Sequence, residues 1–287
     1  MYFAKILACF VLSRQDSRVV HQRLIPLQQL SAVPDIEDIA VETPGSKYDD
    51  LIEWLKTKGG KVHDKLSLLP SSRGGGYGAF VTGGIEKGEI LMTIPRSACI
   101  TVDDVKNDPE SGEIFKKLME QAGPGGQTVA IAGVMAKERL ISEAKDTEGK
   151  FGPYLDTLPW KRGINFQEHM LFWSDEDAET LLDGSMCYSE ATALRGEVNL
   201  AVSVLNKIIG ESILEARGEV TATKSGFSLP WEKKPEKLQG LVEGLSEAVK
   251  GAFVIILTRA FQDGDGDEEK LVPVLDMLQV GSRFGFP

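Results

Sequence analysis

Cysteine and histidine are scarce in this sequence, with three residues of each type among 287. Cys9, Cys99 and Cys187 lie far apart and form no CxxC pair, so neither a disulfide framework nor a zinc site is indicated. The histidines form no HExxH motif or comparable cluster. We therefore expect no metal centre and no histidine-based catalysis.

Long apolar runs are also missing, and no stretch approaches the roughly 18 apolar residues of a membrane-spanning helix. The apolar run 6–12 has only the length of a signal-peptide core, and residues 1–33 contain four basic residues against one acid. Residues 1–45 are interpreted as a leader, either a targeting segment or a disordered one. A targeting leader would direct the protein to a plastid or another organelle; otherwise the cytoplasm is expected.

Positive charge is in short supply, because 32 lysines and arginines face 43 acids and leave a net charge of −11. This balance argues against the broad positive face that non-specific nucleic-acid binding requires. An acidic surface suits basic partners such as lysine-rich segments, although plain solubility explains the same charge. With 42% hydrophobic and 26% charged residues, the composition is that of a folded globular protein.

Nucleotide and hydrolase motifs are absent as well. The glycine-rich residues 74–78 are not followed by Lys-Ser or Lys-Thr, GxGxxG spacing is not met, and no GxSxG elbow occurs. The acidic run 263–267 begins like a calcium loop, but Glu268 and Val274 replace the glycine and the bidentate acid that the loop requires. We interpret this run as a solvated surface loop.

The first part of the chain contains one helical pattern and then strand patterns. Residues 46–58 carry apolar residues on one helical face, begin at a serine and end at a glycine pair, which predicts a helix. Short β-branched or aromatic runs predict strands at 77–81, 89–95 and 98–102. The turn at Lys87 and Gly88 predicts a hairpin within a small antiparallel sheet.

Helical patterns dominate from residue 112 to 261. They are interrupted by a Gly and Pro cluster at 122–126 and by aromatic loops at 151–160. Ser174, followed by three acids, predicts a capped helix start. Residues 271–274 return to strand character, so a long helical block separates two stretches of strand.

Several segments resemble one protein family in the same order. GGGYGAFVTGGIEKGEILMTIPRSACIT, residues 74–101, strongly resembles the opening of a SET domain. FGPYLDTLPW at 151–160 and LFWSDEDAETLLDGS at 171–185 are similar to the helical insert of the Rubisco and actin-histidine methyltransferase subgroup. LTRAF at 257–261 and LVPVLDML at 271–278 resemble the return into the second half of the fold.

The resemblance to the SET-domain protein methyltransferases implies an α+β fold whose β-rich core is split by a long helical insert. It divides the chain into a first SET part at 46–104, an insert at 105–256 and the start of a second SET part at 257–287. It implies S-adenosylmethionine as the cofactor. The implied activity is protein-lysine N-methylation, or histidine methylation as in some relatives, and the implied partner is a protein that bears the acceptor residue.

The same resemblance assigns cofactor-binding residues. The family's glycine-aromatic-glycine turn, here Gly76, Tyr77 and Gly78, touches the cofactor, and glycine permits a close backbone approach. Arg259 is expected to pair with the methionine carboxylate, and Asp276 falls on the family's aspartate. The alternatives are a tight turn for the glycines, a surface charge for Arg259 and a strand-end cap for Asp276.

The chain departs from the family at several positions. Gly75 stands where an acid is common, and the Asn-His pair expected after Asp276 and Met277 is replaced, since Leu278 is followed by Gln279 and Val280. The family's catalytic tyrosine has no counterpart, so no catalytic residue is assigned. We therefore expect a C-terminally truncated, incomplete SET domain. It is either part of a longer enzyme or a non-catalytic protein-interaction module.

Overall fold

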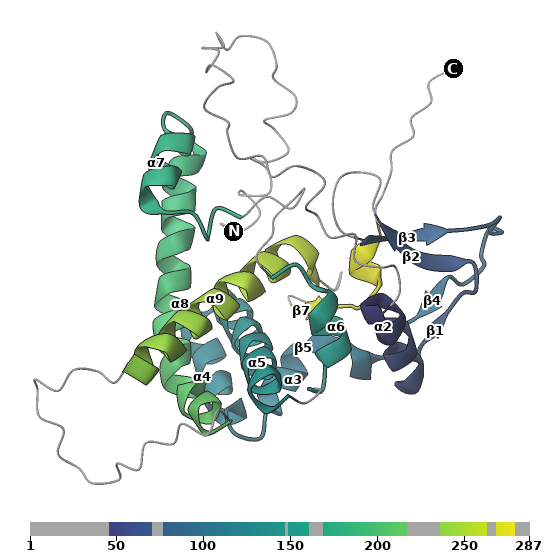
Figure 1. The fold of residues 1–287 in the computed structure, drawn as a ribbon, viewed down its shortest axis with the longest axis horizontal. Coiled ribbons are helices and arrows are strands. Elements are labelled where there is room, and N and C mark those ends of the chain that lie inside the picture. Colours follow the sequence, from purple (N-terminus) through teal and green to yellow (C-terminus); the bar gives the residue numbers. More distant parts are fainter. Residues whose placement is uncertain are drawn as a thin grey trace, which may run out of the picture.

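A helical body and a group of short antiparallel strands make up the fold (Figure 1). The computed structural model describes residues 46–70, 77–146, 149–160, 169–216, 236–262 and 268–278. The helices are α2 (Ser46–Thr57), α3 (Val102–Lys106), α4 (Gly112–Ala122), α5 (Pro124–Lys145), α6 (Gly152–Thr157), α7 (Asp175–Leu182), α8 (Cys187–Ala216) and α9 (Glu236–Arg259). The strands are β1 (Lys61–Val62), β2 (Leu66–Pro70), β3 (Tyr77–Val81), β4 (Met92–Thr93), β5 (Ile100–Thr101), β6 (Phe261–Gln262) and β7 (Glu269–Leu271). Two 3-10 turns are η3 (Arg96–Ala98) and η5 (Leu275–Met277). This arrangement confirms the predicted α+β class.

Helix α5 lies at the centre of the helical body and packs against α4, α8 and α9. Its residues 130–137 are all buried, and small residues among them let the neighbouring helices approach closely. A Cβ atom at Gly133 would lie only 2.5 Å from Cδ2 of Leu205 on α8. Residues 251–256 of α9 are likewise buried, so α5 and α9 form the middle of the core.

The helix boundaries follow local sequence signals. The predicted break at 122–126 is confirmed, because α4 ends at Ala122 and α5 begins at Pro124, with Gly123 between them at a φ of 63°. The predicted cap of α7 is also confirmed, since Ser174 Oγ accepts a hydrogen bond from the Asp177 amide at 3.0 Å. The helix predicted at 46–58 is α2.

The strand pairing differs from the predicted hairpin. Strand β3 occupies the predicted residues 77–81, but it pairs antiparallel with β2, which the sequence reading missed, and β4 pairs with β1. A turn does exist at Gly88, whose φ is +94°. It is closed by the Glu89 side chain, which accepts from the Glu86 amide and contacts His63 Nε2 at 2.7 Å. The turn therefore lies inside a connection and joins no pair of adjacent strands.

Three further segments differ from their predicted secondary structure in extent or type. Of residues 89–95 only Met92–Thr93 forms a strand, and of 98–102 only Ile100–Thr101 does, because Thr101 and Asp104 form a capping box that starts α3. The aromatic loop predicted at 151–160 contains α6 and is largely buried, since its aromatic side chains fill the core. The strand predicted at 271–274 ends at Leu271.

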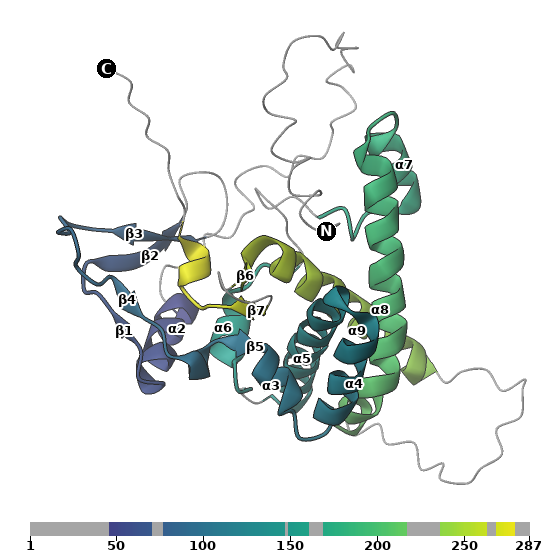
Figure 2. The same cartoon turned by 180° about the vertical axis from the view of Figure 1, so that it is seen from behind.

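The last described strand and turn contact strands from the first part of the chain. Strand β7 pairs with β5 on one side and β6 on the other, and Leu278 bridges Ala79 of β3 in parallel orientation. Figure 2 shows the yellow η5 segment beside β2 and β3, between them and the helical body. The η5 turn and Leu278 are thus brought against β3. In the described parts of the chain, no helix is long and apolar enough to cross a membrane.

Candidate cofactor site

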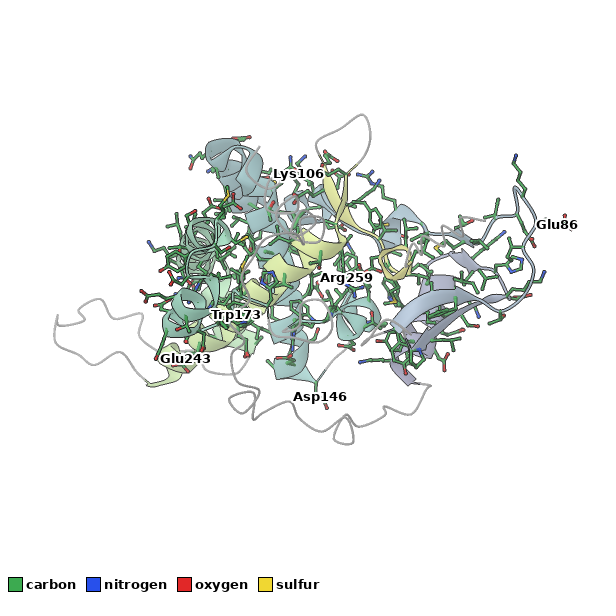
Figure 3. The ribbon with its side chains drawn as sticks, turned by 90° about the horizontal axis from the view of Figure 1, so that it is seen from above. Glu86, Lys106, Asp146, Trp173, Glu243 and Arg259 are labelled. Carbon is green, nitrogen blue, oxygen red and sulfur yellow. The ribbon has the colours of Figure 1, made fainter. Side chains whose placement is uncertain are left out.

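A buried cluster of three side chains lies where α6, α9 and η5 meet. The Asp276 side chain in η5 is fully buried, and its Oδ2 accepts hydrogen bonds from the Tyr154 hydroxyl at 3.0 Å and from Arg259 Nη1 at 3.2 Å. Tyr154 of α6 is fully buried, whereas the Arg259 side chain is 23% exposed. Figure 3 places Arg259 between the helical body and the strands. The cluster therefore has a closed interior and one partly open cationic end.

The chain after β7 turns tightly and points Asp276 inward. Val274 has a φ of 66°, a rare conformation for a β-branched residue. The Asp276 amide donates to the Val272 carbonyl at 3.2 Å, and the Met277 amide donates to the Val274 carbonyl at 3.1 Å. Val272, Val274 and Met277 are buried and anchor the turn in the core. The position of Asp276 is thus held by hydrophobic packing on both sides of it.

Burial controls the ionisation of the cluster. It raises the pKa of Asp276 above the usual value, and the positive charge of Arg259, followed by hydrogen bonds from Tyr154 and Arg259, opposes this effect without overcoming it. Burial, followed by the nearby Asp276, raises the pKa of Tyr154 well above its usual value. The Tyr154 phenol consequently keeps its proton at neutral pH and acts as the donor in this pair. Oδ1 of Asp276 has no hydrogen-bond partner among the described residues.

Tyr77 and Gly78, the described part of the predicted glycine-aromatic segment, belong to β3, which packs against η5. Gly78 is buried in β3, and the bridge between Ala79 and Leu278 aligns β3 with the residues after η5. The Tyr77 ring stacks on Tyr48 of α2, with ring centroids 3.8 Å apart and planes inclined by 22°. This stacking holds the Tyr77 ring against α2 at the start of β3.

The predicted site residues thus have different outcomes. Arg259 and Asp276 contact each other directly, and Gly78 lies on the strand beside η5. Gly76 lies outside the described residues. The sequence reading assigned no role to Tyr154, although this tyrosine belongs to one of the segments that carried the family resemblance. The sequence does not show that Tyr154 is fully buried in the short helix α6, which has a proline in its first turn, and a role for this tyrosine depends on that burial.

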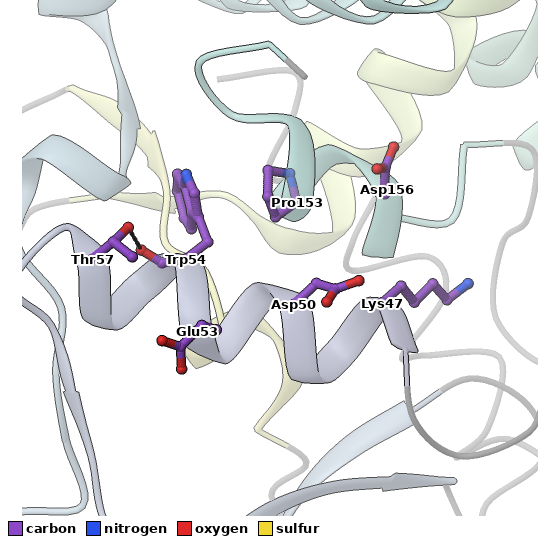
Figure 4. A pocket seen from close by; sticks show the side chains of 7 residues that line it. All are labelled: Lys47, Asp50, Glu53, Trp54, Thr57, Pro153 and Asp156. Atoms are coloured by element: carbon purple, nitrogen blue, oxygen red, sulfur yellow. Dashed lines mark hydrogen bonds between the residues drawn. The ribbon is translucent and has the colours of Figure 1, made fainter. Parts of the chain in front are cut away.

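A surface pocket of about 330 Å³ lies on the outer side of α6, between this helix and α2 (Figure 4). It is lined by Lys47, Asp50, Glu53, Trp54, Thr57, Pro153 and Asp156. Burial raises the pKa of Asp156, and the positive charges of Arg139 and Lys47 oppose that effect. Three acids against one lysine make the pocket acidic. Because Tyr154 is fully buried and bonded to Asp276, the pocket and the cluster lie on different faces of α6.

Metal binding is not indicated by the geometry. Within the described ranges, no three side chains of the His, Cys, Asp or Glu type are grouped so that they could hold an ion.

The sequence is similar to known methyltransferases at low identity. N-lysine methyltransferase setd6 of Xenopus laevis is 23% identical over 242 residues, which cover 79% of this chain and 45% of the relative. N-lysine methyltransferase setd6 of Danio rerio is 26% identical over 137 residues, 48% of this chain and 27% of the relative. The chain thus spans less than half the length of these curated relatives. No protein-family model matches it.

The structure is similar to solved SET domains. The SET domain of LSMT bound to lysine and AdoHcy matches with a TM-score of 0.57 and 14% identity, covering 83% of this chain and 44% of that chain. Rubisco LSMT bound to AdoMet matches with a TM-score of 0.55 and 15% identity, covering 81% and 44%. The likeness shows that the described chain has the α+β fold of a SET domain.

Proposed function

We propose that this chain carries the cofactor-binding part of an S-adenosylmethionine-dependent protein-lysine N-methyltransferase of the Rubisco-methyltransferase-like subgroup. The observation that carries the proposal is the contact between Arg259 and Asp276 beside β3, within a SET fold. In this proposal, residues 105–256 form the helical insert between a first SET part at 46–104 and a second SET part that begins at residue 257.

The residues present fit the chemistry of the cofactor. S-adenosylmethionine carries a carboxylate, and a partly exposed guanidinium can bind a carboxylate with two parallel hydrogen bonds. Asp276 engages one terminal nitrogen of Arg259, and a guanidinium has five N–H donors, so donors remain for a ligand. The buried glycine of β3 would let the backbone approach the ligand closely, because Gly78 has no side chain.

The bound cofactor would supply an electrophilic methyl group. In this proposal Arg259 binds the carboxylate, and Gly78 and Tyr77 contact the cofactor from β3. Burial of Tyr154 and of the Asp276 side chain keeps water from the inner side of the cluster, and Arg259 remains partly exposed toward the ligand. Transfer to a neutral amine depends on in-line positioning of the acceptor. The described residues are assigned binding roles, and no catalytic residue is assigned.

Lysine is the proposed acceptor because the curated relatives are named N-lysine methyltransferases and one matched structure is bound to lysine. The net charge of −11 also suits a substrate segment rich in basic residues. Histidine is the second acceptor that the family resemblance allows. A substrate assay with lysine-bearing and histidine-bearing versions of one protein separates the two.

A second candidate is a non-catalytic interaction module with a SET fold. It is favoured by the residues after Met277, where Leu278 is followed by Gln279 and Val280 and the family's Asn-His pair is missing. Such a module would keep the fold, and could keep cofactor binding, without methyl transfer.

Thermal unfolding with S-adenosylhomocysteine tests cofactor binding. A ligand that binds only the folded state at about one hundred times its Kd should raise the Tm by roughly 5–10 °C. Arg259→Ala should remove most of that rise. An unchanged Tm at millimolar ligand would contradict the proposal.

A radiolabelled methyl group on the cofactor tests transfer. If this chain is itself the enzyme, label should appear on lysine-rich protein acceptors and should be lost with Arg259→Ala. Cofactor binding without any label on protein would favour the interaction module over the enzyme.

A further inference from the structure

Resting on the proposed function, we infer that Tyr154 is a positioning residue for the cofactor carboxylate. Its hydroxyl holds the Asp276 carboxylate, and that carboxylate holds the Arg259 guanidinium in the orientation that binds the ligand. Tyr154 belongs to the helical segment between the two SET parts, so the insert would contribute directly to cofactor recognition.

Tyr154 and Arg259 are connected through one oxygen atom of Asp276, so the position of the tyrosine hydroxyl can affect the orientation of the guanidinium. The hydroxyl of Tyr154 and Nη1 of Arg259 both donate to Oδ2 of Asp276. A carboxylate held by a single donor can rotate about its bond to Cβ, whereas two donors on the same oxygen restrict that rotation. Arg259 is the last residue of α9, and its side chain is 23% exposed. Among the described residues, Asp276 is the one ion-pair partner found for it. The carboxylate is therefore the contact that can fix the guanidinium.

Tyr154 is itself rigidly held. Its ring is fully buried, and the hydroxyl of Thr157 donates to the Tyr154 carbonyl at 2.7 Å. Trp160 Nε1 donates to the Leu155 carbonyl at 2.8 Å and closes the end of α6. The donor that reaches Asp276 thus comes from a side chain with little freedom. A positioning group needs this property, because a mobile donor would transmit no orientation.

A purely structural hydrogen bond is the competing explanation, and selectivity between two ligands separates it. S-adenosylhomocysteine has the methionine-derived carboxylate, whereas 5′-methylthioadenosine keeps the adenosine and thioether but lacks the carboxylate. Loss of orientation at Arg259 affects only the first ligand. General destabilisation of the fold affects both.

The experiment is calorimetric titration of the full chain with both nucleosides. Tyr154→Phe keeps the ring and removes the donor, and should weaken S-adenosylhomocysteine about tenfold while 5′-methylthioadenosine stays within about twofold. Thr128→Val is the control, since it removes the hydrogen bond from the buried Thr128 hydroxyl to Glu269 and leaves Tyr154, Asp276 and Arg259 unchanged. It should lower the Tm and leave the ratio of the two affinities unchanged.

Each outcome decides a separate point. If the wild-type chain binds neither nucleoside, the proposed function fails. If it binds both but Tyr154→Phe keeps the wild-type ratio, or weakens both ligands equally, the positioning role is overturned. Should Tyr154→Phe fail to fold, Asp276→Asn takes its place, and an unchanged ratio for that variant also overturns the inference.

Discussion

Lys137 on α5 is a buried charge that is paired with two carboxylates. The Lys137 side chain is 8% exposed, and its Nζ lies 3.0 Å from Oδ1 of Asp108 and 2.8 Å from Oε2 of Glu110. Burial by itself would lower the pKa of Lys137, but the two carboxylates outweigh it and the pKa is raised. Burial would raise the pKa of Asp108, but hydrogen bonds from Lys137 and from the Ser111 amide hold it below the usual value.

Lys137→Met should destabilise the protein by about 3 kcal/mol at neutral pH, because it leaves Asp108 largely buried without its charged partner. The folded-state pKa of Asp108 is depressed, so the ion pair stabilises the fold above the unfolded-state pKa near 3.8 and loses its effect as the pH falls through the folded-state value. The difference between variant and wild type should therefore shrink at pH 3. Urea unfolding at both pH values measures this.

Lys116→Met is the matched control for this prediction. Lys116 pairs with Glu113 one helical turn away, but the Glu113 side chain is 80% exposed. Loss of such a surface pair should change stability little at either pH. An equal loss of stability for Lys137→Met at pH 7 and pH 3 would mean that packing of the lysine stem, and not its charge, stabilises this region.

At the scale of elements, two helix glycines have opposite environments. Gly251 on α9 lies against the end of α6: an added Cβ would overlap the Trp160 carbonyl oxygen and lie 3.0 Å from Cε3 of its indole. Gly196 on α8 is exposed, and an added Cβ would meet nothing within 4 Å. The first glycine is required by packing, whereas the second only lowers helix stability.

Gly251→Ala should destabilise the fold by about 1–3 kcal/mol through overpacking. Gly196→Ala should stabilise it by roughly 0.5–1 kcal/mol, since alanine is the better helix former. Chemical unfolding of the two variants, followed by far-UV circular dichroism, gives both values. A stabilising Gly251→Ala would show that α9 and the Trp160 backbone can separate at low cost.

At the scale of the whole molecule, the strands and the helical body share one core. The same buried cluster contains Leu51 of α2, Leu66 of β2, Phe115 of α4 and Phe253 of α9. Strand β7 also joins residues on both sides of the helical body, because its partners β5 and β6 precede and follow that body in sequence. We therefore expect the two parts to unfold together.

Coincident unfolding can be measured with one tryptophan as a local probe. Replacing Trp160, Trp173 and Trp231 by phenylalanine leaves Trp54 of α2 to report on the region next to the strands. Far-UV circular dichroism reports mainly on the helices. The two signals should give the same urea midpoint, as a two-state transition requires. An earlier fluorescence midpoint would indicate that the strand region unfolds independently.

Features of the fold that depend only on neighbouring residues are predictable from the amino-acid sequence. A capping serine marks the start of α7 at Ser174, and a glycine marks the break between α4 and α5 at Gly123. Side-chain alternation over a few residues predicts the strand at 77–81. The order of the family-like segments also pointed to Arg259 and Asp276, which the fold brings into contact.

The strand partners and the environment of the site depend on contacts between distant parts of the chain, so they are known from the tertiary structure alone. Strand β3 pairs with β2 and not with the segment after Gly88, where the Glu89 side chain closes a separate turn. Tyr154 and Asp276 are 122 residues apart in sequence, so no local pattern could show their hydrogen bond. Burial of that pair depends on the joint packing of α6, α9 and η5, which exists only when the whole core is formed.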